Sequence, residues 1–129
     1  MYKFEGLQVW QEAMKLAAVC YKIAISLPDY ERSGLSDQLR RAVSSILFNI
    51  AEGSGSESDK EFLRFLHISR KSLYETIAIL KFIEHIYKKD DFKAIYDNCD
   101  TVGKLLNGLI RKLNNDKINR NLKYPVANC

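Results

Sequence analysis

The sequence has few of the residues that hold small secreted proteins together. Only three of its 129 residues are cysteines, an odd number without close spacing. Cys20 and Cys99 fall on apolar helical stripes, and Cys129 is the last residue. This pattern argues against a disulfide framework or a thiolate metal site. It predicts reduced thiols in the core and suggests the cytoplasm.

Long hydrophobic runs are absent as well. The first residues contain no apolar stretch typical of a secretory signal, and no run approaches the roughly 20 apolar residues needed to cross a bilayer. We therefore expect a soluble, unprocessed, cytoplasmic protein with no membrane partner. At this length the chain forms one domain, which buries roughly two-thirds of the surface that its unfolded form exposes.

Constellations for catalysis or metal binding are also missing. His67 and His85 share a helical face but are separated by about 27 Å at a rise of 1.5 Å per residue, so they cannot share a metal ion. No carboxylate pair stands out as general acid and base. The Gly53–Ser56 loop follows a helix and lacks the lysine of a nucleotide-binding loop. The sequence therefore predicts a protein that is not an enzyme and has no cofactor and no metal.

What the sequence does contain is apolar residues at steps of three and four, which are typical of amphipathic helices. They predict four helices at about 7–27, 36–52, 59–87 and 91–114. Ser58 is expected to cap the third helix, and Gly53 to end the second as a left-handed cap. Because short links favour antiparallel neighbours, the expected fold is all-α, an antiparallel up-down-up-down four-helix bundle over 1–115. Residues 116–129 are polar and basic, and we expect a flexible tail there.

The first two helices differ in how clearly they separate a core side from a polar side. In the first helix the expected core stripe is Trp10, Ala13, Met14, Ala17, Cys20, Tyr21, Ala24 and Leu27. The second helix buries one side, but its other side carries a second line that is neither a plain solvated face nor a continuation of the core. That line consists of Arg41, Ser45, Phe48 and Glu52.

Arg40 and Arg41 point about 100° apart on the helix and cannot do the same work. We expect Arg41 to lie in a subunit contact if the second line is buried, and Arg40 to be freer. An arginine fork suits phosphate and carboxylate alike, so residue type alone does not choose between RNA and a partner glutamate.

The third helix has a second apolar line beside its core stripe. Four large residues on one edge form a patch of the kind that marks an interface. The line consists of Ile68, Ile79, Phe82 and Ile86, interrupted by Glu75. With the second line of the preceding helix, these residues are the predicted oligomer interface.

The net charge of +4 and the pI near 8.9 permit nucleic-acid binding without requiring it. Positive charge gathers in the second half, most densely from Arg111 to Lys123, where five basic residues face Asp116 alone. Cations that suit phosphate contacts are distributed over three predicted helices and the tail. They are Arg40, Arg64, Arg70, Lys71, Lys81, Arg111, Lys112, Lys117, Arg120 and Lys123.

Several motifs in a fixed order resemble one protein family. They are Leu7–Trp10 (LQVW), 38–43 (QLRRAV), 49–53 (NIAEG), 61–66 (EFLRFL) and 72–75 (SLYE). Over about residues 4–113 the chain resembles the four-helix-bundle proteins of the 23S rRNA intervening-sequence family. The resemblance implies proteins encoded in insertions within bacterial large-subunit rRNA genes, or as free-standing genes. It also implies ring-like homopentamers, and kinship with accessory proteins of diversity-generating retroelements, whose pentameric barrels bind nucleic acid and a reverse transcriptase.

Two functions of different classes follow from these observations. The first is an RNA- or DNA-binding module in which assembly multiplies a modest positive charge. The second is a protein-interaction scaffold whose ring holds another protein, such as a reverse transcriptase, and touches no nucleic acid. The resemblance to the intervening-sequence family favours the first.

Overall fold

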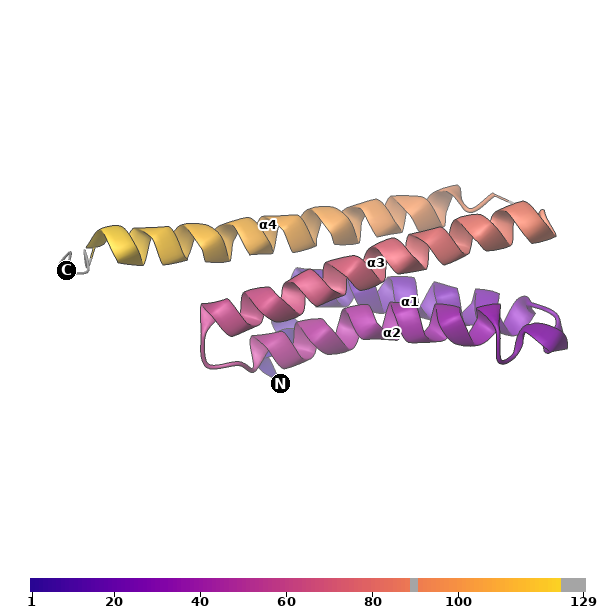
Figure 1. Ribbon diagram of the computed structural model, residues 1–129, viewed down its shortest axis with the longest axis horizontal. Helices are drawn as coiled ribbons and strands as arrows, with labels where there is room; N and C mark the ends of the chain where they lie inside the picture. Colours follow the sequence, from indigo (N-terminus) through magenta and orange to yellow (C-terminus); the bar gives the residue numbers. More distant parts are fainter. Residues whose placement is uncertain (89–90, 124–129) are drawn as a thin grey trace.

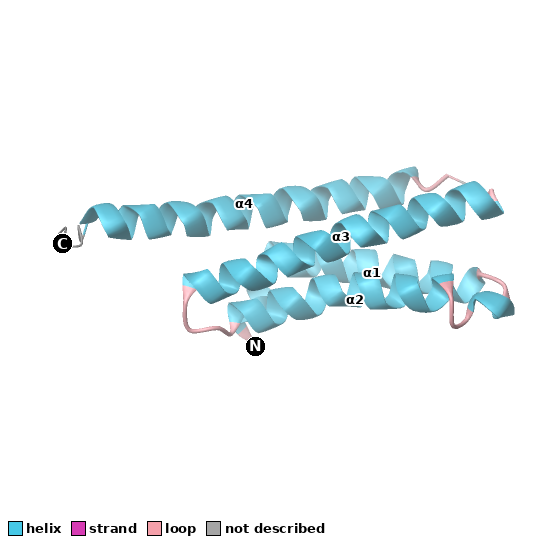
Figure 2. Ribbon diagram, viewed as in Figure 1, coloured by secondary structure: helices cyan, strands magenta, loops and turns pink. Residues whose placement is uncertain are grey.

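The protein is built from helices packed lengthwise, as the computed structural model shows (Figure 1). The structure describes residues 1–88 and 91–123, with side chains as far as Asp116. Within these ranges there is no strand (Figure 2). The four long helices are α1 (Gln8–Ser26), α2 (Leu35–Ser54), α3 (Asp59–Tyr87) and α4 (Lys93–Lys123), and the short turns are η1 (Lys3–Gly6) and η2 (Asp29–Glu31).

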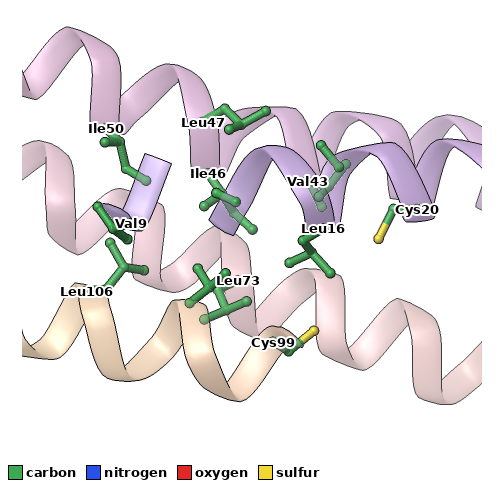
Figure 3. Close-up of a cluster of buried hydrophobic side chains, with 14 of the residues drawn as sticks. Val9, Leu16, Cys20, Val43, Ile46, Leu47, Ile50, Leu73, Cys99 and Leu106 are labelled. Carbon is green, nitrogen blue, oxygen red and sulfur yellow. The ribbon is translucent and has the colours of Figure 1, made fainter. Parts of the chain in front are cut away.

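One apolar core joins all four helices. The helix α2 packs against α1 and α3, and α4 packs against α1 and α3, so that the apolar stripes meet in the middle. Figure 3 shows this meeting point, where Leu16 of α1, Val43 of α2, Leu73 of α3 and Leu106 of α4 converge. The periodicity of the sequence thus predicted a four-helix bundle correctly.

The core stripe predicted for α1 was partly wrong. Met14 and Tyr21 are exposed, whereas Val9 and Leu16 are buried in their place. The buried side of α1 is therefore rotated about the helix axis relative to the predicted stripe, because it faces both α2 and α4. Met14 and Tyr21 are left beside α2, at the surface.

The helices α2 and α3 approach each other closely because small residues lie between them. Ser69 Oγ donates to the carbonyl oxygen of Ile46 at 2.9 Å, and Ser72 Oγ donates to Ser45 Oγ at 2.8 Å. Ser45 also accepts a hydrogen bond from Asn49 Nδ2. Ser45 therefore faces α3, not the outside, and its place in the predicted oligomer interface was wrong.

Gly53 serves this close approach and is not a left-handed cap. It lies inside α2 and has no positive φ. A Cβ atom there would lie 2.8 Å from Phe62 Cδ1 and 2.8 Å from Phe65 Cβ. Among the described non-glycine residues the left-handed conformation occurs at Lys88 (φ 46°, ψ 44°), which ends α3.

The predicted ends of the other helices hold in part. Helix α3 has the predicted bounds, and Ser58 Oγ accepts from the backbone N–H of Glu61 at 3.1 Å. Helix α4 continues to Lys123, past the predicted end at 114, because no proline interrupts it before Pro125. Its last turns run beyond the start of α3 (Figure 1).

The two described cysteines are free thiols in the core, as predicted. Burial raises the pKa of Cys20 to about 12 and that of Cys99 to about 11, because a thiolate would lose its hydration there. Neither group has the lowered pKa of a catalytic thiol. Cys129 lies outside the described residues.

Candidate nucleic-acid interface

Arg70 is held in place at the contact between α3 and α4. Its Nη1 donates to Asn107 Oδ1 of α4 at 3.1 Å, and its Nη2 lies 3.0 Å from His67 Nδ1. The side chain is half-buried. These contacts fix a guanidinium group that has five N–H donors, so donors remain for a ligand.

Other cations lie along the same contact. Arg111 lies one turn beyond Asn107 on α4, and Lys104 lies one turn before it; Lys71 follows Arg70 in the chain and therefore points about 100° away from it. All three are exposed, and within the described residues none of them takes part in an ion pair. We call this surface the α3–α4 seam. It consists of His67, Arg70, Lys71, Tyr74, Lys104, Asn107 and Arg111.

A shallow groove of about 230 Å³ lies in the middle of the seam. Tyr74 and Lys104 line its sides, with Asp100 as the one acidic residue in its lining. Gly103 leaves room for it, since a Cβ there would already touch Leu73 Cδ2 at 3.4 Å. The seam thus combines a fixed arginine, exposed lysines and an exposed aromatic ring, which are the groups that contact phosphates and bases.

Two of the predicted cations interact with other groups of the chain. Arg64 pairs with Glu61 and lies over the Phe65 ring at 4.5 Å from its centroid, and this arginine lowers the pKa of Glu61. Lys81 Nζ lies 3.9 Å from the centroid of the Tyr96 ring. Arg64 therefore interacts within α3, and Lys81 reaches across to α4, further along the same α3–α4 contact.

The expectation that Arg40 is freer than Arg41 was wrong. Arg40 donates from Nη2 to the carbonyl oxygen of Arg32 at 3.3 Å, and 30% of its side chain is exposed. Arg41 is 81% exposed, with Nε 2.9 Å from Asp37 Oδ2. The reason is that Arg40 lies toward α1 and folds over the connection from α1 to α2, whereas Arg41 points away from both neighbours.

Lys112 lies on the other side of α4. With Lys104 it lines a second groove, of about 280 Å³, whose other lining residues include Leu7, Val9 of α1 and Leu105 of α4. The predicted contacts at Lys117, Arg120 and Lys123 lie outside the residues whose side chains are described. The structure thus places Arg70 and Arg111 at the α3–α4 contact around Asn107, with Lys81 further along that contact, and it engages Arg40 and Arg64 elsewhere.

Lys104 was missed in the sequence, although it lies on both grooves. A signal was present, because Lys104 and Arg111 are seven residues apart and therefore on one face of a helix. Asn107 was missed as a partner of Arg70 because that contact joins two helices, whereas His67 lies three residues before Arg70 on α3, a spacing at which side chains of one helix meet. No pattern within one helix shows which residue of another helix lies opposite.

The predicted oligomer interface is only partly at the surface. Phe82 is 51% exposed, and Phe48 and Ile86 are also exposed. Ile68 is half-buried. Ile79 is 6% exposed and belongs to the core, so its place in the interface was wrong. Seven residues separate it from Ser72, which faces α2, and the close approach of α2 and α3 covers both.

The charged members of that interface and Phe48 lie on the outer sides of α2 and α3. Arg41, Glu52 and Glu75 are all exposed. Phe48 borders an apolar groove of about 380 Å³ between α1 and α2, which we call the Phe48 groove. Its other lining residues are Met14, Ala17, Ala18, Tyr21, Ser44 and Leu47. An open apolar groove next to an exposed aromatic ring is typical of an interface.

The described residues include neither a cluster of metal ligands nor a membrane-spanning helix. They contain no group of three or more histidine, cysteine, aspartate or glutamate side chains placed to hold a metal ion. None of their helices is both long enough and apolar enough to span a membrane.

Comparison with known proteins gives a family. No curated protein matches the chain. The profile of the 23S rRNA-intervening sequence proteins matches residues 5–108, which include the core of all four helices and the whole α3–α4 seam apart from Arg111. The chain therefore belongs to the family of 23S rRNA-intervening sequence proteins.

Proposed function

We propose that this chain is a non-enzymatic RNA-binding module whose phosphate-binding surface is the α3–α4 seam. The observation that carries the proposal is the fixed position of Arg70, held by Asn107 and His67 beside the exposed Lys71 and Arg111. An arginine fork matches the oxygens of a phosphate, and each lysine adds a point charge. Phosphates bound there displace counterions, so most of the affinity is electrostatic and independent of sequence.

The proposal includes assembly into a ring-like homopentamer, as the family resemblance implies. The exposed Phe48 and Phe82 and the Phe48 groove support it, because apolar surface of this kind is usually covered. Five copies of a chain of charge +4 carry 5 × 4 = +20. Such a ring attracts RNA more strongly than one copy does.

The architecture beneath this surface is proposed as an antiparallel up-down-up-down bundle. The order in which residues of neighbouring helices meet supports this architecture. Ser45 meets Ser72 while Gly53, further along α2, lies against Phe62, earlier in α3. In the same way Arg70 of α3 meets Asn107 of α4, whereas the later residue Glu84 accepts from the earlier Tyr96.

A protein-interaction scaffold is the second candidate, and the Phe48 groove favours it. Its lining is almost entirely apolar, which suits a protein partner such as a reverse transcriptase better than a phosphate chain. This candidate is favoured over the first if the chain captures one specific protein, if that capture persists after nuclease treatment, and if the chain binds no RNA.

A salt titration with matched variants tests the RNA-binding proposal. We expect the protein to bind mixed RNA at about 50 mM salt and to lose most of that affinity at about 200 mM. The seam variant Arg70→Ala/Lys104→Ala/Arg111→Ala should weaken binding by tenfold or more. A control that removes the same charge from the other side, Lys15→Ala/Lys22→Ala/Arg32→Ala, should bind nearly as the unaltered protein does. Equal losses in the two variants contradict the placement on the seam.

A further inference from the structure

Three aromatic rings form a series at the beginning of the chain. Trp10 packs against the core, and the Phe4 ring lies 5.0 Å from it between centroids. The Tyr2 ring lies parallel to the Phe4 ring, within 2°, at 6.0 Å. Tyr2 is 74% exposed. The series therefore starts in the core and ends on an aromatic face that is open to solvent.

Hydrogen bonds hold this series in place. The backbone N–H of Tyr2 donates to Glu5 Oε1 at 2.9 Å, and the N–H of Glu5 donates to the carbonyl oxygen of Tyr2 at 3.1 Å. Gln11 Nε2 of α1 donates to the carbonyl oxygen of Glu5 at 2.9 Å. A ring fixed before binding loses little conformational entropy when a ligand stacks on it.

Positive charge lies close to the aromatic series. Lys3 stands between Tyr2 and Phe4 in the chain, and Leu7–Val9, which follow directly, line the groove that contains Lys104 and Lys112. Lys104 also lines the groove of the α3–α4 seam. Figure 1 places the start of the chain and the second half of α4 at the same end of the bundle. The turn η1 itself contacts α1 and α2, so these lysines of α4 lie at the same end of the bundle as the aromatic series but on a different helix.

We infer that Tyr2 and Phe4 form a stacking platform for an unpaired base of single-stranded RNA, with Lys3 beside the flanking phosphate and Lys104 and Lys112 on phosphates further along the strand. This inference rests on the proposed RNA binding and narrows its substrate. Stacking on an aromatic ring requires a base whose face is free, which a single strand offers and the interior of a duplex does not. The apolar floor of the groove beside Lys112 suits the base or sugar of the next nucleotide.

A comparison of two RNA probes tests the inference. We measure binding of a 12-nucleotide oligouridylate and of a 12-base-pair RNA duplex, each with the full chain. Tyr2→Ala should weaken binding of the single strand about 5- to 150-fold and leave the duplex within about twofold, because one stacked base is lost. Tyr2→Phe keeps the ring and should bind the single strand as the unaltered protein does. Tyr30→Ala is the matched control, since Tyr30 is 77% exposed in η2, between α1 and α2.

The fluorescence of Trp10 gives a second readout. It is the one tryptophan of the chain and contacts Phe4, so oligouridylate should change its emission and the duplex should not. Single-strand affinity that Tyr2→Ala leaves unchanged overturns the platform, and so does an equal loss for both probes. If the seam variant still weakens binding in that case, the proposed function stands without the platform. If the unaltered protein binds neither probe, both fail.

Discussion

A methyl group on Gly53 would lie 2.8 Å from ring carbon Cδ1 of Phe62, closer than packed side chains allow. We therefore expect Gly53→Ala to lower the free energy of unfolding by about 1 to 2 kcal/mol, because overpacking outweighs the gain in helix propensity. Urea unfolding followed by circular dichroism measures this. Gly55→Ala is the control, since its Cβ would lie 3.6 Å from the carbonyl oxygen of Glu52, an ordinary contact. Equal stability of the two variants contradicts the close approach of α2 and α3.

Phe82 and Ile79, three residues apart on α3, should respond differently to substitution. Phe82→Glu should dissociate the oligomer and leave the helical content unchanged, because the ring is half-exposed in one chain. Ile79→Ala should instead lower the free energy of unfolding by about 2 to 5 kcal/mol, as for other buried residues. Light scattering coupled to size exclusion, together with thermal unfolding, separates the two effects. A Phe82→Glu protein that stays assembled argues against this interface.

The buried thiols should make stability depend on alkaline pH. The pKa of Cys20 is raised in the folded state from 9.0 to about 12, so the stabilisation is complete below pH 9 and is lost as the pH rises toward 12. At pH 10.5 the loss from Cys20 is about 2 kcal/mol. Unfolding measured from pH 8 to 10.5 should show a smaller slope for Cys20→Ala. An identical slope would falsify this assignment.

Arg70 should contribute through its geometry as well as its charge. Arg70→Lys keeps the charge but loses the contacts with Asn107 and His67, so we expect weaker RNA binding with an unchanged salt dependence. Arg70→Ala removes one phosphate contact and should also reduce the slope of log K against log salt by about 1. Titrations at four salt concentrations separate the two. If Arg70→Lys binds like the unaltered protein, the fork has no part in recognition.

Helical periodicity predicted the four helices because each buries a continuous stripe. It predicts the centre of that stripe but not its width, which depends on how closely the neighbour approaches. Ile79 was assigned to the surface for this reason, since small residues such as Ser45 and Ser72 draw α2 nearer than average side chains would. The same limit applies to the site. Lys71 and Arg111 can be predicted from residue type, but the contact of Arg70 with Asn107 joins two helices and depends on their register.

The last described turns of α4 extend past the start of α3, so this part of α4 protrudes beyond the helix it packs against (Figure 1). Leu113 is the last described residue of α4 to be buried, and the three described side chains after it are exposed. Every core side chain that the structure describes on α4 thus lies at or before Leu113, and a chain shortened after Asp116 keeps all of them. Comparing the shortened protein with the full chain therefore tests what the protruding part of α4 binds.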